Sequence, residues 1–98
     1  MEITNMLTIS TAHIAESTAN FLEELVNNKH SDRFDVPMVM QHTYGFIIWV
    51  GQDDITPKEY GISEDLRACM QLAYNNACHW LNLDSDAEIV PDLETFDW

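Results

Sequence analysis

The fold is decided by the stretch Met38-Val39-Met40-Gln41-His42-Thr43-Tyr44-Gly45-Phe46-Ile47-Ile48-Trp49-Val50, which is the most β-prone part of the chain. Residues 46–50 form a continuous apolar run rich in aromatic and β-branched side chains, which is typical of a strand buried on both faces over part of its length. Residues 38–40 form a shorter apolar run, and Gly45 lies between the two, where it can adopt the positive φ of a turn. The stretch therefore predicts a β-hairpin in the middle of a small sheet.

The segments before and after this hairpin are expected to add a strand to the sheet and two helices that pack on it. Residues 6–10 alternate in part and include the β-branched Thr8 and Ile9, which favours a first strand. A helix follows, whose start is offered by Ser10, Thr11 or His13. Its apolar face consists of Ile14, Thr18, Phe21, Leu22, Leu25 and Val26. A second helix is expected from a cap at Ser63 to about Asn82, with an apolar face made of Leu66, Cys69, Met70, Ala73, Ala77, Trp80 and Leu81.

The segments between and after these elements are polar. Residues 29–37 predict a loop with Phe34 as its one large apolar side chain, and residues 56–61 are compatible with a single helical turn. Residues 84–98 alternate acidic and apolar side chains and allow two interpretations. One is a final edge strand at residues 87–90 with the rest packed on the domain; the other is a disordered tail that docks on a partner. We favour partial order, because five large apolar side chains are costly to leave in water.

The predicted element order is β-α-β-β-α with a possible C-terminal edge strand. This order predicts an α+β fold, a small antiparallel sheet with two helices packed on it. A chain of 98 residues is long enough for one domain and too short for two, so residues 1–98 are expected to form a single domain.

The charge of the chain is the most unusual property of its composition. Seventeen Asp and Glu oppose four Lys and Arg, which gives a formal net charge of −13 at pH 7. Phosphate contacts need clustered Lys and Arg, so direct binding of nucleic acid is not expected. Instead, the charge favours a partner with a basic surface.

The cysteines and the hydropathy indicate a cytosolic protein. Cys69 and Cys78 are nine positions apart on the predicted second helix, which places them on opposite sides, about 13 Å apart along the axis. They cannot form a disulfide with each other in that helix, and unpaired thiols are typical of a reducing cytosol. We see neither a leader sequence nor an apolar run long enough to span a bilayer, and expect no membrane partner.

The histidines do not form a recognisable catalytic or metal motif. His13, His30, His42 and His79 show no i,i+4 pairing, and neither cysteine belongs to a Cys-x-x-Cys motif, so we expect neither zinc nor another cofactor. A hydrolytic site could be built from Ser10, His13 and an acidic residue, but the chain has no Gly-x-Ser-x-Gly elbow. The alternative is that Ser10 and Thr11 cap a helix and that His13 forms a hydrogen bond near its start.

Acidic residues are concentrated after position 52. Asp53, Asp54, Glu59, Glu64 and Asp65 lack the alternate spacing and the glycine of a calcium loop. They are either a solvated surface or a functional acidic surface. Tyr74 lies one residue off the apolar face of the second helix and Trp98 is terminal, and either could anchor a partner.

Two stretches, Leu7-Thr8-Ile9-Ser10-Thr11-Ala12-His13-Ile14 and Tyr44-Gly45-Phe46-Ile47-Ile48-Trp49-Val50, resemble a small family of uncharacterised bacterial and prophage proteins. The resemblance covers these two short stretches, 15 of the 98 residues. It implies a protein of the bacterial host cytosol from a phage or mobile element, and it brings no activity and no catalytic residues. In size and charge the chain is also similar to anti-CRISPR proteins and other DNA mimics.

The leading hypothesis is a non-enzymatic inhibitor that binds the basic surface of a nucleic-acid-binding host protein, with carboxylates in place of phosphates. The residues expected to meet that partner are Asp53, Asp54, Glu59, Glu64, Asp65, Asp84, Asp86, Glu88, Asp92, Glu94, Asp97 and Trp98. One alternative is a homodimeric structural or regulatory protein that pairs through an exposed strand or the Trp98 tail. The other is a small enzyme with a site near Ser10, His13 and His42.

Overall fold

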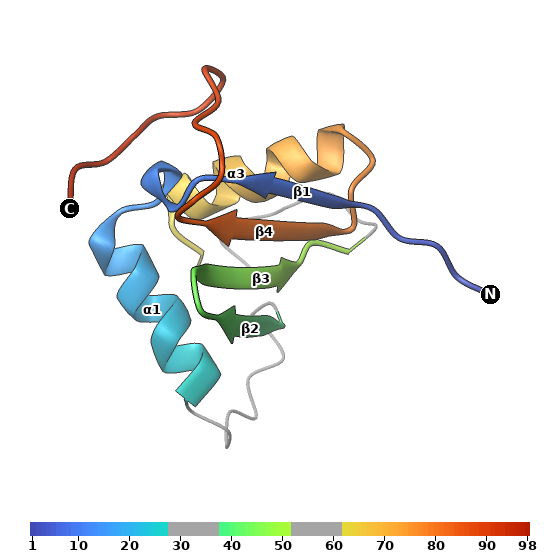
Figure 1. Ribbon diagram of the computed structural model, residues 1–98, viewed down its shortest axis with the longest axis horizontal. Coiled ribbons are helices and arrows are strands. Elements are labelled where there is room, and N and C mark those ends of the chain that lie inside the picture. Colours follow the sequence, from blue (N-terminus) through green and yellow to red (C-terminus); the bar gives the residue numbers. More distant parts are fainter. Residues whose placement is uncertain (28–37, 52–61) are drawn as a thin grey trace.

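The hairpin expected from residues 38–50 is present and forms half of a four-stranded sheet (Figure 1). The computed structural model describes residues 1–27, 38–51 and 62–98. Its elements are β1 (Met6–Ile9), the short 3-10 helix η1 (Thr11–His13), α1 (Glu16–Asn27), β2 (Val39–His42), β3 (Gly45–Trp49), α3 (Glu64–Asn75) and β4 (Trp80–Asp84). The loop containing Phe34 and the turn expected at residues 56–61 lie outside the described residues.

Within the hairpin, β2 and β3 pair antiparallel, with His42 opposite Gly45. A glycine is required at this position, because a Cβ on Gly45 would overlap the carbonyl oxygen of Leu83 on the next strand. Along β3 the burial alternates: Phe46 and Ile48 are buried, whereas the residues between and after them are only half-buried. The expectation that this strand is buried on both faces is therefore wrong.

The sheet has the strand order β1-β4-β3-β2 and is mixed. The α+β fold with two helices on a small sheet is confirmed, but the expectation of a wholly antiparallel sheet is wrong, because β1 and β4 are parallel. The chain path explains this direction. The backbone N–H groups of His79 and Trp80 donate to the carbonyl oxygen of Asn5, at 2.9 and 3.1 Å. The chain therefore returns to the start of β1 before β4 begins, and the two strands run the same way.

The second helix is shorter than expected. We predicted that it would reach Asn82, but α3 ends at Asn75, and the side-chain amide of Asn76 donates to the carbonyl oxygen of Leu72 at 2.8 Å. Ala77 follows with φ of 57°, in the left-handed region that ends helices. Residues 80–84, assigned in part to the helix, form β4 instead. The edge strand expected at residues 87–90 is also wrong: the extra strand lies earlier in the chain and inside the sheet.

The hydrophobic core occupies one face of the sheet. Residues opposite one another in the ladders share a face, so Ile9, Leu83 and Phe46 point to the same side. Both helices contribute to the same core cluster and therefore cover this face; its members are Ile9, Ile14, Ala19, Leu22, Phe46, Ile48, Val50, Ile62, Leu66, Cys69, Met70, Ala73, Leu81 and Leu83. Among residues 1–27, 38–51 and 62–98, no helix has the length and apolar character needed to cross a bilayer.

Candidate functional site

The C-terminal segment, residues 85–98, contains no helix or strand but lies along the turn formed by Ser10–Ile14. The backbone N–H of Ser10 donates to the carbonyl oxygen of Glu88 at 3.0 Å, and the N–H of Phe96 donates to that of Ala12 at 2.8 Å. The indole N–H of Trp98 donates to the carbonyl oxygen of Ile14 at 2.8 Å. Two backbone–backbone hydrogen bonds and one from the Trp98 side chain therefore position this acidic segment on the domain.

His13 provides the most buried of these contacts, since its side chain is only 1% exposed. The backbone N–H of Val90 donates to Nε2 of His13 at 2.9 Å, and Nδ1 lies 2.9 Å from the carbonyl oxygen of Glu94. A peptide N–H can only donate and a carbonyl oxygen can only accept, so Nε2 carries no proton and Nδ1 carries one. The neutral imidazole thus bridges two points of the C-terminal segment. We predicted a hydrogen bond of His13 near a helix start; its actual partners lie 77 and 81 positions away.

The docked segment presents most of its carboxylates to solvent. The exposed ones are Asp86, Glu88, Asp92, Glu94 and Asp97. Asp84 is half-buried, and its Oδ1 accepts a hydrogen bond from the backbone N–H of Asp86 at 2.8 Å. Trp98 is 58% exposed even though its indole is bonded. The predicted acidic surface of this segment is thus present on a positioned backbone.

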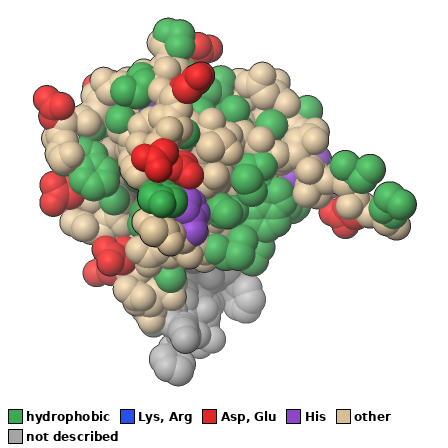
Figure 2. Space-filling view, in the orientation of Figure 1, with side chains coloured by type: hydrophobic (Ala, Val, Ile, Leu, Met, Phe, Trp, Pro, Cys, Tyr) green, Lys and Arg blue, Asp and Glu red, His purple; other side chains and the backbone are tan. Residues whose placement is uncertain are grey.

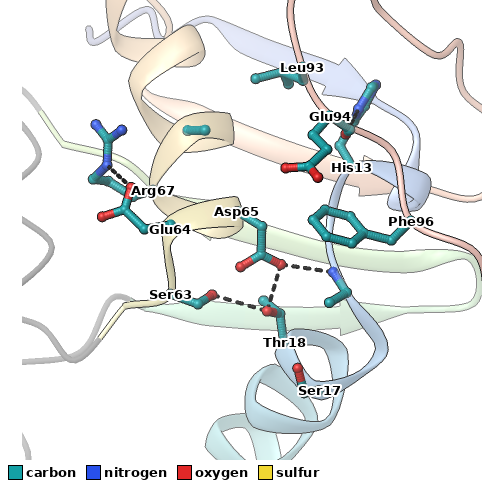
Figure 3. A pocket seen from close by; sticks show the side chains of 12 residues that line it. His13, Ser17, Thr18, Ser63, Glu64, Asp65, Arg67, Leu93, Glu94 and Phe96 are labelled. Carbon is teal, nitrogen blue, oxygen red and sulfur yellow. Dashed lines mark hydrogen bonds and ion pairs between the residues drawn. The ribbon is translucent and has the colours of Figure 1, made fainter.

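Asp65 has a different role from the one expected of it. Its Oδ2 accepts hydrogen bonds from the backbone N–H of Ala15 at 2.8 Å and from the hydroxyl of Thr18 at 2.6 Å (Figure 3). The hydroxyl of Thr18 also lies 3.0 Å from that of Ser63. Burial raises the pKa of the Asp65 carboxyl, but the hydrogen bonds from Ser63, Thr18 and Ala15 outweigh it, so the pKa lies below its ordinary value. Oδ2 of Asp65 therefore links the start of α3 to the start of α1, and the role of this carboxylate toward a partner stays a prediction.

A pocket of about 430 Å³ lies beside Asp65, between the starts of the two helices and the C-terminal segment (Figure 3). Two of its carboxylates are already engaged, Asp65 with α1 and Glu64 with Arg67 in an ion pair of 3.2 Å, and Glu94 adds an exposed carboxylate to the lining. His13, which also lines the pocket, uses both ring nitrogens. In the part of the chain that the structure describes, no group of three or more His, Cys, Asp or Glu side chains could hold a metal ion.

The residues of the small-enzyme hypothesis are not brought together. The hydroxyl of Ser10 accepts the N–H of Ala12 at 3.0 Å, so Ser10 caps η1, as the alternative interpretation expected. His42 lies on β2, where its Nε2 is 2.7 Å from Oδ1 of Asn82 in the sheet. The pocket beside Asp65 is lined by His13 but not by Ser10 or His42, and a second pocket is lined by Ser10 but by neither histidine.

The two cysteines are both free, and Cys78 lies beyond the end of α3 rather than on the helix. Cys69 is buried in the core. Burial, and then the negative charge of Asp65, raise the pKa of its thiol to about 12. The thiolate is the nucleophilic form, so Cys69 is a core residue rather than a reactive one.

The remaining predicted partner residues fall into two groups. Asp53, Asp54 and Glu59 lie outside the described residues. Glu64 is exposed and paired with Arg67. The described residues contain twelve of the 17 carboxylates and one Lys or Arg, which is Arg67. The excess of negative charge is therefore strong in the described residues.

The sequence interpretation missed one surface. The face of the sheet opposite the core carries large apolar side chains, and Figure 2 shows hydrophobic side chains gathered there over β1, β4 and β3. Its members include Trp49 and Trp80, which the sequence interpretation treated as core residues. The alternation along residues 80–84, with Leu81 and Leu83 buried, is the signal that could have revealed this face.

These features define a small α+β domain with an acidic C-terminal segment docked on its N-terminal turn. Residues 6–98 match the family described as "Family of unknown function (DUF5983) C-terminal domain", and the chain belongs to that family. The expectation of an uncharacterised family is thus confirmed, whereas its bacterial or prophage origin stays a prediction. Neither the curated proteins nor the solved structures contain a match.

Proposed function

We propose that the protein is a binding module that presents carboxylates to the basic surface of a nucleic-acid-binding protein and thereby blocks that protein. The observation that carries this proposal is the docked C-terminal segment. Its exposed carboxylates, at Glu88, Asp92, Glu94 and Asp97, stand on a backbone held by the turn at residues 10–14.

Rigid placement matters because a partner that reads phosphates reads their spacing as well as their charge. A free acidic tail must lose conformational entropy when it binds, whereas a docked one has already lost much of it. The long-range attraction between a chain with a formal net charge of −13 and a basic groove also speeds their association. The proposal assigns the protein no catalysis, and it places the protein in a bacterial host cytosol, in the mobile-element context that the resemblance implies.

The test is capture of a partner from a bacterial lysate at low salt, followed by elution with rising salt and by displacement with DNA or RNA. We expect a nucleic-acid-binding protein that nucleic acid displaces. Affinity for that protein should fall as salt rises, because screening weakens charge pairs. A partner whose affinity is indifferent to salt would contradict the proposal.

A matched pair of variants locates the interaction. Asp92→Asn with Asp97→Asn removes two exposed charges from the C-terminal segment, and Glu23→Gln with Glu24→Gln removes two exposed charges from α1. The first pair should weaken binding about fivefold, as expected for two surface ion pairs, and the second pair should weaken it less. Equal losses would show that only total charge matters.

A further inference from the structure

The face of the sheet opposite the core carries two rows of side chains that cross all four strands. The first row is Met38, Trp49, Trp80 and Met6; the second is Met40, Ile47, Asn82 and Thr8. Met38 precedes β2 and joins the first row because its carbonyl oxygen accepts the N–H of Trp49 at 2.9 Å. We call these two rows the open sheet face.

The open sheet face is apolar and accessible, and it takes no part in the core cluster. Met38, Met40 and Met6 are 54%, 46% and 45% exposed. The ring of Trp80 meets that of Trp49 edge-on, with centroids 4.7 Å apart. His79 stacks on Trp49 with centroids 6.2 Å apart and an angle of 20°. The indoles are therefore held in place by neighbours, and contiguous exposed apolar surface of this kind marks an interaction site.

The charges around this face have one sign. Asp84 follows Trp80 and Asn82 on the same side of β4, and Asp86 donates its backbone N–H to it. Arg67, the one Lys or Arg among residues 1–27, 38–51 and 62–98, belongs to α3, which covers the other face. In the described residues, the open sheet face thus combines indole and thioether groups with a carboxylate and has no Lys or Arg. The imidazole of His42 lies at its edge, with Nε2 2.7 Å from Oδ1 of Asn82.

We propose that the open sheet face binds an arginine-bearing, partly apolar segment of the protein partner; this rests on the proposed function and names the surface and the chemistry that recognise the partner. A guanidinium is attracted both to an indole ring and to a carboxylate. Methionine side chains adapt to aliphatic groups of varied shape. A second copy of the chain is disfavoured as the occupant because each copy brings a charge of −13.

The test uses short synthetic peptides and the isotope-labelled full chain. One peptide repeats Arg-Leu-Gly-Ser; the other repeats Arg-Ser-Gly-Ser and has the same charge without the apolar side chain. The indole signals of Trp49 and Trp80 report on the open sheet face, and that of Trp98 reports on the C-terminal segment. Met40→Lys and Asn20→Lys form a matched pair of variants, since both residues are exposed and both changes add one positive charge.

We expect the Arg-Leu peptide to shift the signals of Trp49 and Trp80 more than that of Trp98, and to bind more tightly than the Arg-Ser peptide. Met40→Lys should weaken its binding about tenfold and Asn20→Lys about twofold at most. Equal weakening by both variants, or shifts confined to the C-terminal segment, would overturn this inference and leave the proposed function standing. Absence of binding by the Arg-Leu peptide at low salt would also overturn this inference, whereas the proposed function is decided separately by the capture of a partner protein. A dimer in light scattering that Met40→Lys dissociates would identify a second copy as the occupant and would also overturn this inference.

Discussion

His13 shows how one side chain can organise a segment that has no secondary structure of its own. Replacing it with alanine leaves the N–H of Val90 and the carbonyl oxygen of Glu94 without their partner and opens a cavity. We expect His13→Ala to lower the free energy of unfolding by about 2–4 kcal/mol. Hydrogen exchange at the Val90 amide should also become faster. Chemical denaturation and exchange measured by mass spectrometry check both.

The control for this variant is His79→Ala, which removes a half-buried histidine at the other end of the sheet. It should leave exchange in residues 85–98 unchanged. If His13→Ala and the unaltered protein exchange equally fast at Val90, the bridge through His13 does not hold the segment.

Asp65 makes stability depend on pH in a defined direction. The pKa of its carboxyl is below the ordinary value of 3.8 in the folded chain and returns to that value on unfolding. The stabilisation is therefore present above pH 3.8 and is lost as pH falls through the folded value. Asp65→Asn should lower the free energy of unfolding by about 1–3 kcal/mol at pH 7, and the difference from the unaltered protein should shrink in acid.

Glu64→Gln removes the same charge from the neighbouring exposed position and is the control for general charge effects. It should change stability by less than about 1 kcal/mol at either pH, because surface ion pairs contribute little. Denaturant unfolding at pH 7 and below pH 3.8 measures the free energy of unfolding of the unaltered protein, Asp65→Asn and Glu64→Gln. A deficit of Asp65→Asn that stays constant with pH would contradict the assignment.

At the scale of elements, the sequence predicted the strands and helices whose apolar spacing fits only one type of secondary structure. The hairpin, β1, α1 and the start of α3 follow directly from alternating or helical spacing. β4 was missed because Ala73, Ala77 and Trp80 continue the helical spacing of α3. The helix ends where Ala77 takes a left-handed φ of 57°, and no glycine marks that position.

The candidate site was predicted in its chemistry but not in its geometry. The acidic composition of residues 84–98 is visible in the sequence, whereas their docking depends largely on backbone groups of Ser10, Ala12 and Ile14. Backbone hydrogen bonds leave no pattern of side chains, so the sequence could not distinguish a docked segment from a free one. The open sheet face was missed because its Met and Trp residues are typical of a core.

The end of α3 gives a prediction at this scale. A left-handed φ is unfavourable for alanine and allowed for glycine, so Ala77→Gly should stabilise the protein by about 0.5–1 kcal/mol. Ala68→Gly is the matched control inside α3, where glycine should destabilise by about 1 kcal/mol. Thermal unfolding of both variants shows whether each one is more or less stable than the unaltered protein. Destabilisation by Ala77→Gly would contradict the left-handed conformation of Ala77.

At the scale of the whole molecule, repulsion among like charges opposes folding. With a formal charge of −13, raising the ionic strength should screen this repulsion and raise the melting temperature. Calorimetry in sodium chloride between about 0.01 and 0.5 M, where the screening length falls from about 30 Å to a few ångströms, measures the effect. A melting temperature that does not change would mean that the carboxylates are too far apart to repel.

The parallel pairing of β1 with β4 has a consequence for the synthesis of the chain. Thr8 and Asn82 are neighbours in the sheet although 74 positions separate them. The first strand therefore emerges from the ribosome long before β4 has been synthesised. Until then, the core residues Ile9 and Ile14 stay exposed in the nascent chain. Contacts this distant in sequence also slow folding after release. We therefore expect the nascent chain to become resistant to proteases only when residues 80–98 have left the exit tunnel, because translation that stops before Trp80 yields a chain without β4, one of the two central strands.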